Sequence, residues 1–280
     1  MELGRFGIWW SGTWQAGATP GDQVAAEMEQ LGYGTLWASA GFERGIPRRF
    51  GDLLEWTERA VVATGILSVW PNDPAEVAAE AASLGPRFLL GLGASHAPIV
   101  ERSGEQYRRP RHKVAEFLDG LDAAGTSPPR ILAALGDRML RLAGERSLGA
   151  HPYFVPLEHT AHARQVLGEG PLLTPELAVV LSDVAADARA LARGYTTGYL
   201  RLSNYAGNLL ALGWSPDDLQ AGGSDRLVDA VVAWGTAERV AERIREHLEA
   251  GADHVCIQVV HGTRDAFPLA EYRELAAALV

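Results

Sequence analysis

Short, nearly continuous apolar segments alternate along the chain with Ala-, Glu- and Arg-rich stretches in which apolar residues recur every three or four positions. The first pattern is typical of strands buried on both faces of a parallel sheet, and the second is typical of amphipathic helices. The predicted strands are RFGIWW (5–10), GTLWAS (34–39), VVATGILSV (61–69), RFLLGLG (87–93), RILAAL (130–135), AHPYFV (150–155), LAVVLS (177–182) and HVCIQVV (254–260). The alternation therefore predicts eight successive strand–helix units.

Local signals mark where several predicted helices begin and end. Asp73–Pro74 precedes the helical stretch 75–84, and proline is favoured in a first helical turn. Thr236 is an N-cap candidate for a helix that Gly251 ends. Segment 194–235 is too long for a simple strand–helix connection, and we expect its part YTTGYLRLSNYAGNLLALGW (195–214) to form extra helix over one end of the barrel.

The order of elements favours one closed barrel. No linker rich in Pro, Gly and Ser divides the chain, so residues 1–280 are expected to form a single domain. Eight units in 280 residues match the (β/α)8 TIM barrel of the α/β class, whose usual size is about 250 residues. A doubly wound parallel sheet is the alternative. In a barrel, the chemistry lies at the C-terminal ends of the strands and in the loops that follow them.

Composition and charge exclude several functional classes. The 25 Lys and Arg residues against 35 Asp and Glu give a net charge of -10, which disfavours nucleic acid and anionic membranes as partners. No apolar run approaches the roughly 18–20 residues that span a bilayer, and the N-terminus lacks the layout of a signal peptide. The single cysteine, Cys256, excludes an intrachain disulfide and fits a reducing compartment, so we expect a cytoplasmic protein. The single lysine, Lys113, lies on a predicted helix, which disfavours Schiff-base chemistry.

The segment GLGASHAP (91–98) follows a predicted strand directly. Its glycines allow a ligand to approach the backbone closely, and Ser95 and His96 follow in the loop. It is not a dinucleotide fingerprint, because His96 stands where G-x-G-x-x-G has its third glycine. His96 is therefore either a catalytic residue at the barrel mouth or a structural histidine, and the sequence leaves both readings open.

The segment AALGDRM (133–139) runs from the end of a strand through Gly136 into a helix. Free N–H groups at a helix N-terminus, close approach at Gly136 and the positive charge of Arg138 together form an anion site of the kind that holds phosphate. Many turns of this form bind nothing, which is the competing interpretation.

Four of the eight tryptophans, Trp9, Trp10, Trp37 and Trp70, fall at or just after predicted strand ends. A barrel mouth lined by them would suit a flat, ring-shaped ligand, and we expect them to line the substrate pocket. The alternative is that they only fill the top of the barrel.

His159 and His162 in EHTAH stand three residues apart near a predicted helix start. A metal would need a third ligand, and the spacing differs from H-E-x-x-H, so we expect a solvated helix start and no metal site. The motifs G-x-S-x-G and G-x-x-x-x-G-K-[ST] are absent, which removes hydrolase and nucleotide-kinase interpretations.

An ordered set of motifs runs in register from Gly4 to Val260: RFGIWW, GYGTLW, VVATGI, NDPAE, RFLLGLGASHAP, AALG, GAHPYFVPLEHTA, DRLVDAVVAWGTAERVAERI and GADHVCIQ. This set resembles the luciferase-like monooxygenase superfamily and, more narrowly, its branch of probable coenzyme F420-dependent oxidoreductases. The resemblance implies a luciferase-like (β/α)8 barrel with a helical insertion before the last strand.

The resemblance also implies a cofactor, with coenzyme F420 expected and FMN as the alternative. Family members hold the ring against a bulge on the third strand that contains a non-prolyl cis peptide, and the matching bond is Gly65–Ile66. They place the cofactor phosphate at the helix start after the fifth strand, here Ala134 to Met139, with Tyr153 beside it. The expected cofactor-binding residues are Gly65, Ile66, Gly93, Ala94, Ser95, Ala134, Leu135, Gly136, Asp137, Arg138, Met139 and Tyr153.

The catalytic residue expected from the resemblance is His96. Some deazaflavin dehydrogenases of the superfamily carry a catalytic histidine at the end of strand two, where this chain has Ala40 and Gly41. They place an acid after strand four, where this chain has His96. A deazaflavin carries a hydride and the protein supplies orientation and a proton, which is the role expected of His96.

The expected function is F420-dependent hydride transfer between the reduced deazaflavin and a small organic acceptor such as an activated alkene, imine or carbonyl. An FMN-dependent monooxygenase is the enzymatic alternative, and a catalytically degenerate cofactor-binding member is the non-enzymatic one. The sequence does not reveal which small molecule is the substrate. The oligomeric state is equally hidden, with a homodimer as one candidate assembly.

Overall fold

The computed structural model describes residues 1–262 and 266–279. The strands are β1 (Phe6–Trp10), β2 (Thr35–Ala38), β3 (Val61–Thr64), β4 (Leu67–Ser68), β5 (Phe88–Gly93), β6 (Arg130–Leu132), β7 (Gly149–Ala150), β8 (Leu172–Leu173), β9 (Glu176–Leu181), β10 (Val232–Gly235) and β11 (Val255–Val259). The helices are α1 (Gly21–Gln30), α2 (Arg49–Glu55), α3 (Pro74–Ser83), α4 (Ala97–Arg102), α5 (Pro110–Ala123), α6 (Asp137–Arg146), α7 (Leu157–Leu167), α8 (Ala185–Leu200), α9 (Ser203–Ala211), η1 (Asp217–Gly222), α10 (Asp225–Val231), α11 (Ala237–Glu249) and α12 (Leu269–Leu279).

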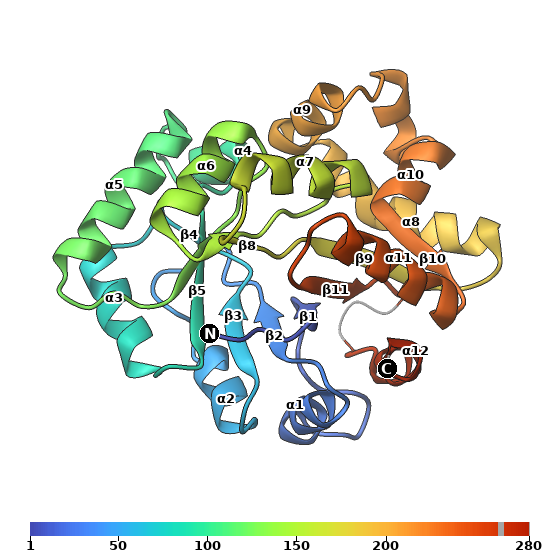
Figure 1. Cartoon of the computed structure of the whole chain (residues 1–280), viewed down its shortest axis with the longest axis horizontal. Coiled ribbons are helices and arrows are strands. Elements are labelled where there is room, and N and C mark those ends of the chain that lie inside the picture. Colours follow the sequence, from blue (N-terminus) through green and yellow to red (C-terminus); the bar gives the residue numbers. More distant parts are fainter. Residues whose placement is uncertain (263–265, 280) are drawn as a thin grey trace.

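The strands pair in parallel, and neighbours follow the order β10, β9, β11, β1, β2, β3, β5, β6, β7, β8, with β4 also paired to β5. Because β8 and β9 are separated by only two residues, the last strand of this order continues almost directly into β9, near the other end of the order, and the sheet curls into a barrel. Figure 1 shows helices around the sheet and α8, α9 and α10 gathered at the upper right. The predicted TIM-barrel fold is confirmed.

Each predicted strand segment contains or overlaps a strand of this barrel. The segment 61–69 is divided into β3 and β4 at the Gly65–Ile66 peptide bond, which is cis, as the resemblance implied. The segment 150–155 needs correction, because β7 covers only Gly149–Ala150 and the chain then leaves the strand.

The helical insertion predicted before the last strand is confirmed as α8, α9, η1 and α10, between β9 and β11. Residues 232–235 form a further strand, β10, that we did not predict. This strand pairs with β9 from Val232 opposite Ala178 to Gly235 opposite Leu181. Its partner is distant in the sequence, so no local pattern in VAWG reveals the pairing.

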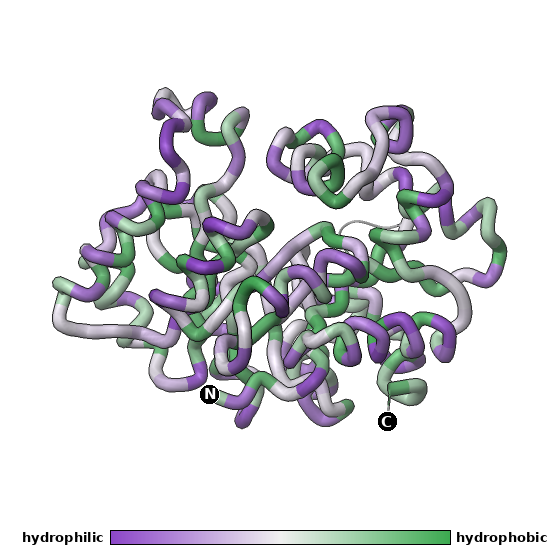
Figure 2. The backbone as a smooth tube through the Cα atoms, turned by 45° about the horizontal axis from the view of Figure 1, so that its top comes forward, coloured by the Kyte–Doolittle hydropathy of each residue, from purple (hydrophilic) through white to green (hydrophobic). Residues whose placement is uncertain are grey.

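The helix starts follow the local signals. The Asp73 carboxylate accepts hydrogen bonds from the N–H groups of Ala75 and Glu76 at 2.8 and 3.1 Å. Thr236 Oγ1 accepts one from Arg239 N at 3.4 Å. Figure 2 shows hydrophilic and hydrophobic positions alternating along the outer helical turns, as amphipathic helices packed on a sheet require.

The barrel interior is closed by large buried side chains. It contains Trp9, Trp37, Leu89, Ile131 and Cys256, which pack as one cluster. The middle of the barrel is therefore filled by side chains. None of the helices in the described part of the chain has the length and apolar character needed to cross a membrane.

Candidate active site

A cavity of about 420 Å³ opens at the C-terminal ends of the strands, which is within the size range of cofactor and small-molecule sites. We call it the inner cavity. The predicted site residues that line it are Trp9, Gly65, Ile66, Gly93, Ala94, Ser95, His96, Ala134, Leu135, Gly136, Met139 and Tyr153. The structure thus gathers residues from five separate strand ends in one place. Asp137 and Arg138 lie outside it, in an adjoining pocket.

Part of the wall of the inner cavity is formed by the backbone at Gly65 and Gly93, because neighbouring side chains leave no space for a Cβ atom at either position. A Cβ atom at Gly65 would lie 2.4 Å from Trp9 Nε1, and one at Gly93 would lie 2.9 Å from Ile66 Cδ1. Gly65 N donates a hydrogen bond to Ala38 O at 2.7 Å, which ties this segment to the end of β2. The backbone here is held by the sheet and is accessible from the cavity.

Two buried ring nitrogens in the cavity wall lack hydrogen-bond partners among the described residues. They are Trp9 Nε1, which is a donor, and His151 Nε2. His151 Nδ1 donates to Thr174 O at 2.6 Å, so its Nε2 is an acceptor in the neutral ring. Burial lowers the pKa of His151 to about 4, which keeps that ring neutral. Since buried polar groups are normally paired, these atoms suit a polar ligand.

His96 lies at the rim of the inner cavity, half-buried, directly before α4. Its Nδ1 donates a hydrogen bond to Asn204 Oδ1 at 2.8 Å, and its ring lies 5.2 Å from that of Tyr205. Burial lowers the pKa of His96, and the hydrogen bond with Asn204 opposes this shift. The insertion, through α9, therefore fixes the orientation of the imidazole.

A group of tyrosines forms the wall beneath the insertion. Tyr153 Oη donates to Gln258 Oε1 at 2.7 Å and lies 2.7 Å from Tyr199 Oη. Behind them, the carboxyl group of Glu176 accepts hydrogen bonds from Phe154 N at 3.1 Å and from Tyr195 Oη at 3.2 Å. Burial raises the pKa of Glu176 to about 8, so this acid is mostly protonated at neutral pH.

Sequence reasoning did not find this tyrosine wall. Tyr195, Tyr199 and Tyr205 lie in the insertion, where they read as helical residues without a catalytic motif. Glu176 begins β9 and carries no spacing signal. Only the folding of α8 and α9 over the barrel mouth brings these residues to Tyr153.

The expectation that four tryptophans line the cavity needs correction, because only Trp9 does so. Trp37 is fully buried, stacked on His151 with ring centroids 4.3 Å apart. Trp10 is turned toward the helical layer, where it packs against Phe267. Trp70 donates its Nε1–H to Ala94 O at 2.7 Å and supports the loop after β5. All four tryptophans lie near strand ends in the sequence, and this position alone does not reveal the direction of each side chain.

Of the two histidines in EHTAH, only His159 differs from the expected solvated helix start. His159 is buried, and its Nε2 donates to Leu135 O at 2.9 Å, so it supports the loop at the cavity instead of facing solvent. His162 is partly exposed and lies 2.8 Å from Asp137 Oδ1. Within residues 1–262 and 266–279, no group of three or more His, Cys, Asp or Glu side chains could hold a metal ion.

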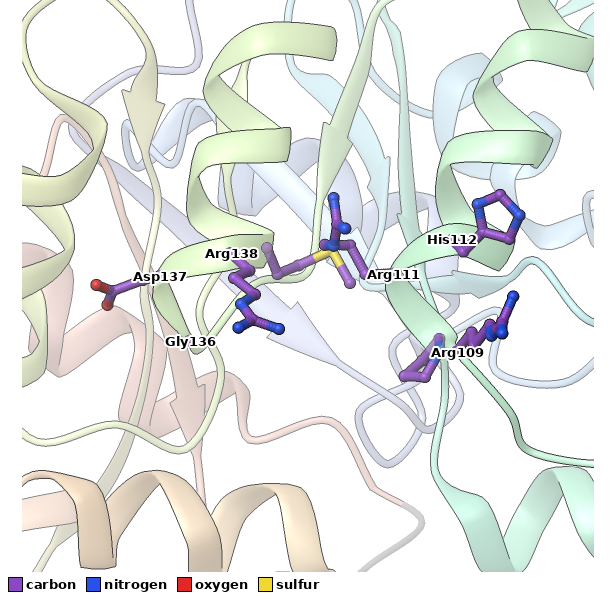
Figure 3. Close-up of a pocket in the computed structure, with 8 residues that line it drawn as sticks. Arg109, Arg111, His112, Gly136, Asp137 and Arg138 are labelled. Atoms are coloured by element: carbon purple, nitrogen blue, oxygen red, sulfur yellow. The ribbon is translucent and has the colours of Figure 1, made fainter.

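A second pocket of about 710 Å³, which we call the outer pocket, adjoins the inner cavity at Pro110, Gly136 and Met139. It lies between the beginnings of α5 and α6, and Figure 3 shows its side chains. The lining residues are Arg109, Pro110, Arg111, His112, Gly136, Asp137, Arg138 and Met139. Most of its polar side chains are basic, unlike those of the inner cavity.

Comparisons with known proteins agree with this architecture. The family profile of luciferase-like monooxygenases matches residues 10–254. No curated protein sequence matches the chain.

Several solved structures resemble the whole chain at low sequence identity. An F420-dependent secondary alcohol dehydrogenase in complex with an F420-acetone adduct has a TM-score of 0.73 and 15% identity, with 100% of each chain covered. A coenzyme F420-dependent tetrahydromethanopterin reductase from Methanopyrus kandleri has a TM-score of 0.63 and 15% identity, covering 100% of this chain and 99% of that one. The oxygenating constituent of 3,6-diketocamphane monooxygenase from Pseudomonas putida, in complex with FMN, has a TM-score of 0.67 and 18% identity, covering 98% and 96%. At such identities the likeness shows the fold.

Proposed function

The chain belongs to the luciferase-like monooxygenase family, and from this premise we propose that it is an F420-dependent oxidoreductase. It would transfer a hydride between the reduced deazaflavin and a small organic acceptor. The observation that carries the proposal is a ring-sized cavity with a glycine wall at one side and the start of α6 at one end. Similarity to two structures described as F420-dependent enzymes supports the deazaflavin.

The residues present fit such a cofactor. Gly65 and Gly93 contribute backbone without side chains to the cavity wall, which suits a flat ring. Trp9 Nε1–H and His151 Nε2 are an unpaired donor and acceptor, which suits a ring edge that carries both carbonyl and N–H groups. The N–H groups at the start of α6, around Gly136, would hold the phosphate.

A bound deazaflavin supplies a two-electron hydride donor or acceptor. In the reducing direction the acceptor carbon gains the hydride, and its oxygen, nitrogen or neighbouring carbon needs one proton. We assign that proton to His96, because it lies at the cavity rim and Asn204 holds its Nδ1–H, which leaves Nε2 for the acceptor. The tyrosine wall excludes water from the same side and orients the acceptor.

The direct test is a titration of the purified protein with coenzyme F420 and, separately, with FMN, followed by absorbance and fluorescence. We expect F420 to bind at least about tenfold more tightly than FMN, a difference of about 1.4 kcal/mol. Tighter binding of FMN would overturn the deazaflavin assignment in favour of an FMN-dependent monooxygenase, which the FMN-bound structural neighbour makes the second candidate. Binding of neither would overturn the cofactor proposal.

A further inference from the structure

The outer pocket is too large for a phosphate alone. Its volume is about 710 Å³ against about 420 Å³ for the inner cavity, and the two spaces meet at Gly136. A phosphate held at the start of α6 would sit at this junction and leave most of the outer pocket free. A ligand that extends beyond its phosphate would therefore continue into the outer pocket.

The outer pocket carries three guanidinium groups without partners. Arg109 and Arg111 come from the start of α5, and Arg138 comes from the first turn of α6 on the facing side (Figure 3). Within the described residues, none of these three guanidinium groups has a hydrogen bond or an ion pair. Unpaired cations gathered in a cavity of a protein with a net charge of -10 favour an anionic ligand there.

The opposite ends of the same two helices show that pairing is otherwise available. Arg146, at the end of α6, lies 2.7 Å from Asp119 and 3.0 Å from Asp122 on α5. Arg130 also lies 2.7 Å from Asp122. The helix pair is thus joined by neutralised arginines at one end, and its arginines are left unpaired at the pocket end.

The one acidic residue of the outer pocket does not neutralise these arginines. Asp137 points away from α5 in Figure 3 and lies 2.8 Å from His162 Nε2 and 3.4 Å from Arg141. Asp137 is thus already engaged away from the pocket. The space between α5 and α6 therefore stays positive.

We infer that the outer pocket binds a chain of carboxylates attached beyond the cofactor phosphate, as in the oligoglutamate tail of coenzyme F420, and that Arg109 and Arg111 thereby select F420 against FMN. This inference rests on the proposed function and deepens it. FMN ends at one phosphate and would leave the outer pocket empty. Several weak contacts to a flexible acidic tail would add affinity without fixing one geometry.

The experiment compares three ligands on the full chain: F420 with its tail, the same deazaflavin ending at its phosphate group without glutamates, and FMN. The double variant Arg109→Ala/Arg111→Ala should weaken F420 binding by roughly tenfold, since each exposed charge contact contributes modestly. It should change the affinity of the tail-free deazaflavin by less than about twofold. The tenfold loss should shrink at high salt, because exposed ion pairs are screened.

The matched control is Arg102→Ala/Arg108→Ala, which removes the same charge from two exposed arginines that do not line the outer pocket. It should leave the affinity for F420 near that of the wild type. All four side chains are exposed, so thermal unfolding should confirm that both double variants fold. If the control variant weakens F420 binding equally, general electrostatic attraction explains the loss of affinity, and the proposal that the outer pocket binds the tail is overturned.

Failure of the tail site and failure of the proposed function give different results. If the wild type binds F420 and its tail-free form equally well, the tail site is overturned while the deazaflavin function stands. If an anionic substrate occupies the outer pocket instead, the double variant should raise the KM for that substrate without changing F420 affinity. If the wild type binds neither deazaflavin, both proposals fall.

Discussion

The inner cavity and the outer pocket share three residues and are built in opposite ways. The inner cavity lies at strand ends fixed by the barrel, and its walls are glycines, tyrosines and buried rings. The outer pocket lies between two helix starts, and its walls are exposed arginines. A ligand in the first is recognised by shape and by a few hydrogen bonds, and a ligand in the second by charge.

This difference predicts different responses to change. Substitutions in the inner cavity should alter chemistry, stability or ring affinity through packing, and salt should matter little because buried contacts are poorly screened. Substitutions in the outer pocket should alter affinity only, and salt should reduce their effect. Proteins that bind long, charged cofactors can therefore divide recognition between a rigid part and an adaptable part.

The largest effect should come from His96 at the rim of the inner cavity. His96→Ala should lower turnover about 100- to 10,000-fold, because general acid catalysis by a positioned side chain contributes about that much. Cofactor affinity should fall far less. Steady-state kinetics with an active acceptor and a parallel F420 titration measure both quantities, and near-normal turnover would return His96 to a structural role.

Glu176 should produce the next largest effect, on stability. Its pKa of about 8 in the folded protein lies above its ordinary value of 4.5, so the folded state holds a proton that the unfolded state releases. The free energy of unfolding should therefore decrease as pH rises from about 4.5 to 8, and Glu176 should account for about 3–5 kcal/mol of that decrease.

The isosteric variant Glu176→Gln cannot ionise and should lose this part of the pH dependence, so its stability relative to the wild type should rise between pH 5 and pH 9. Urea unfolding at several pH values measures the difference. Glu249→Gln, an exposed change on α11, is the control and should show no such trend. Parallel pH curves for Glu176→Gln and the wild type would contradict the burial of an ionisable acid.

Variants at two glycines test recognition of the ring by shape and recognition of the phosphate separately. Gly65→Ala places a methyl group 2.4 Å from Trp9 Nε1, so the indole must move, and ring affinity should fall about 10- to 100-fold together with some stability. At Gly136, an added Cβ atom would meet no atom within 4 Å, and the φ of -84° is compatible with valine. It should weaken cofactor binding about tenfold by obstructing the phosphate, at a cost of about 1 kcal/mol as a poorer N-cap.

Isothermal titration with F420 and thermal unfolding distinguish the two glycine variants. Gly65→Ala should affect both measurements, and Gly136→Val should affect mainly the titration. Unchanged cofactor affinity in Gly136→Val would refute the phosphate position at the start of α6.

The smallest effect should come from Asn204, which positions His96. The hydrogen bond from His96 to Asn204 raises the pKa of His96, so Asn204→Ala should lower it further. The protonated imidazole then persists only to lower pH, and turnover in the reducing direction should fall at neutral pH by less than about tenfold. A pH–rate profile shifted toward acid, with KM for F420 unchanged, is the expected signature; an unshifted profile would contradict the positioning role.

The local sequence determined much of this protein. Apolar runs predicted the barrel strands because strands buried on both faces can tolerate few polar residues. Asp73 and Thr236 marked helix starts because capping is a contact between near neighbours in the chain. The positions of Gly65, Gly93 and His96 at strand ends followed from the barrel itself, whose strand ends face one mouth.

Side-chain direction and long-range pairing could be decided only by the tertiary structure. Trp9 and Trp10 are adjacent in the sequence, yet successive side chains of a strand point to opposite faces, so one lines the inner cavity and the other packs in the helical layer. Strand β10, the tyrosine wall and the facing of Arg109 with Arg138 each depend on segments far apart in the chain. Local patterns fix what an element is, whereas the packing of elements fixes which side chains meet.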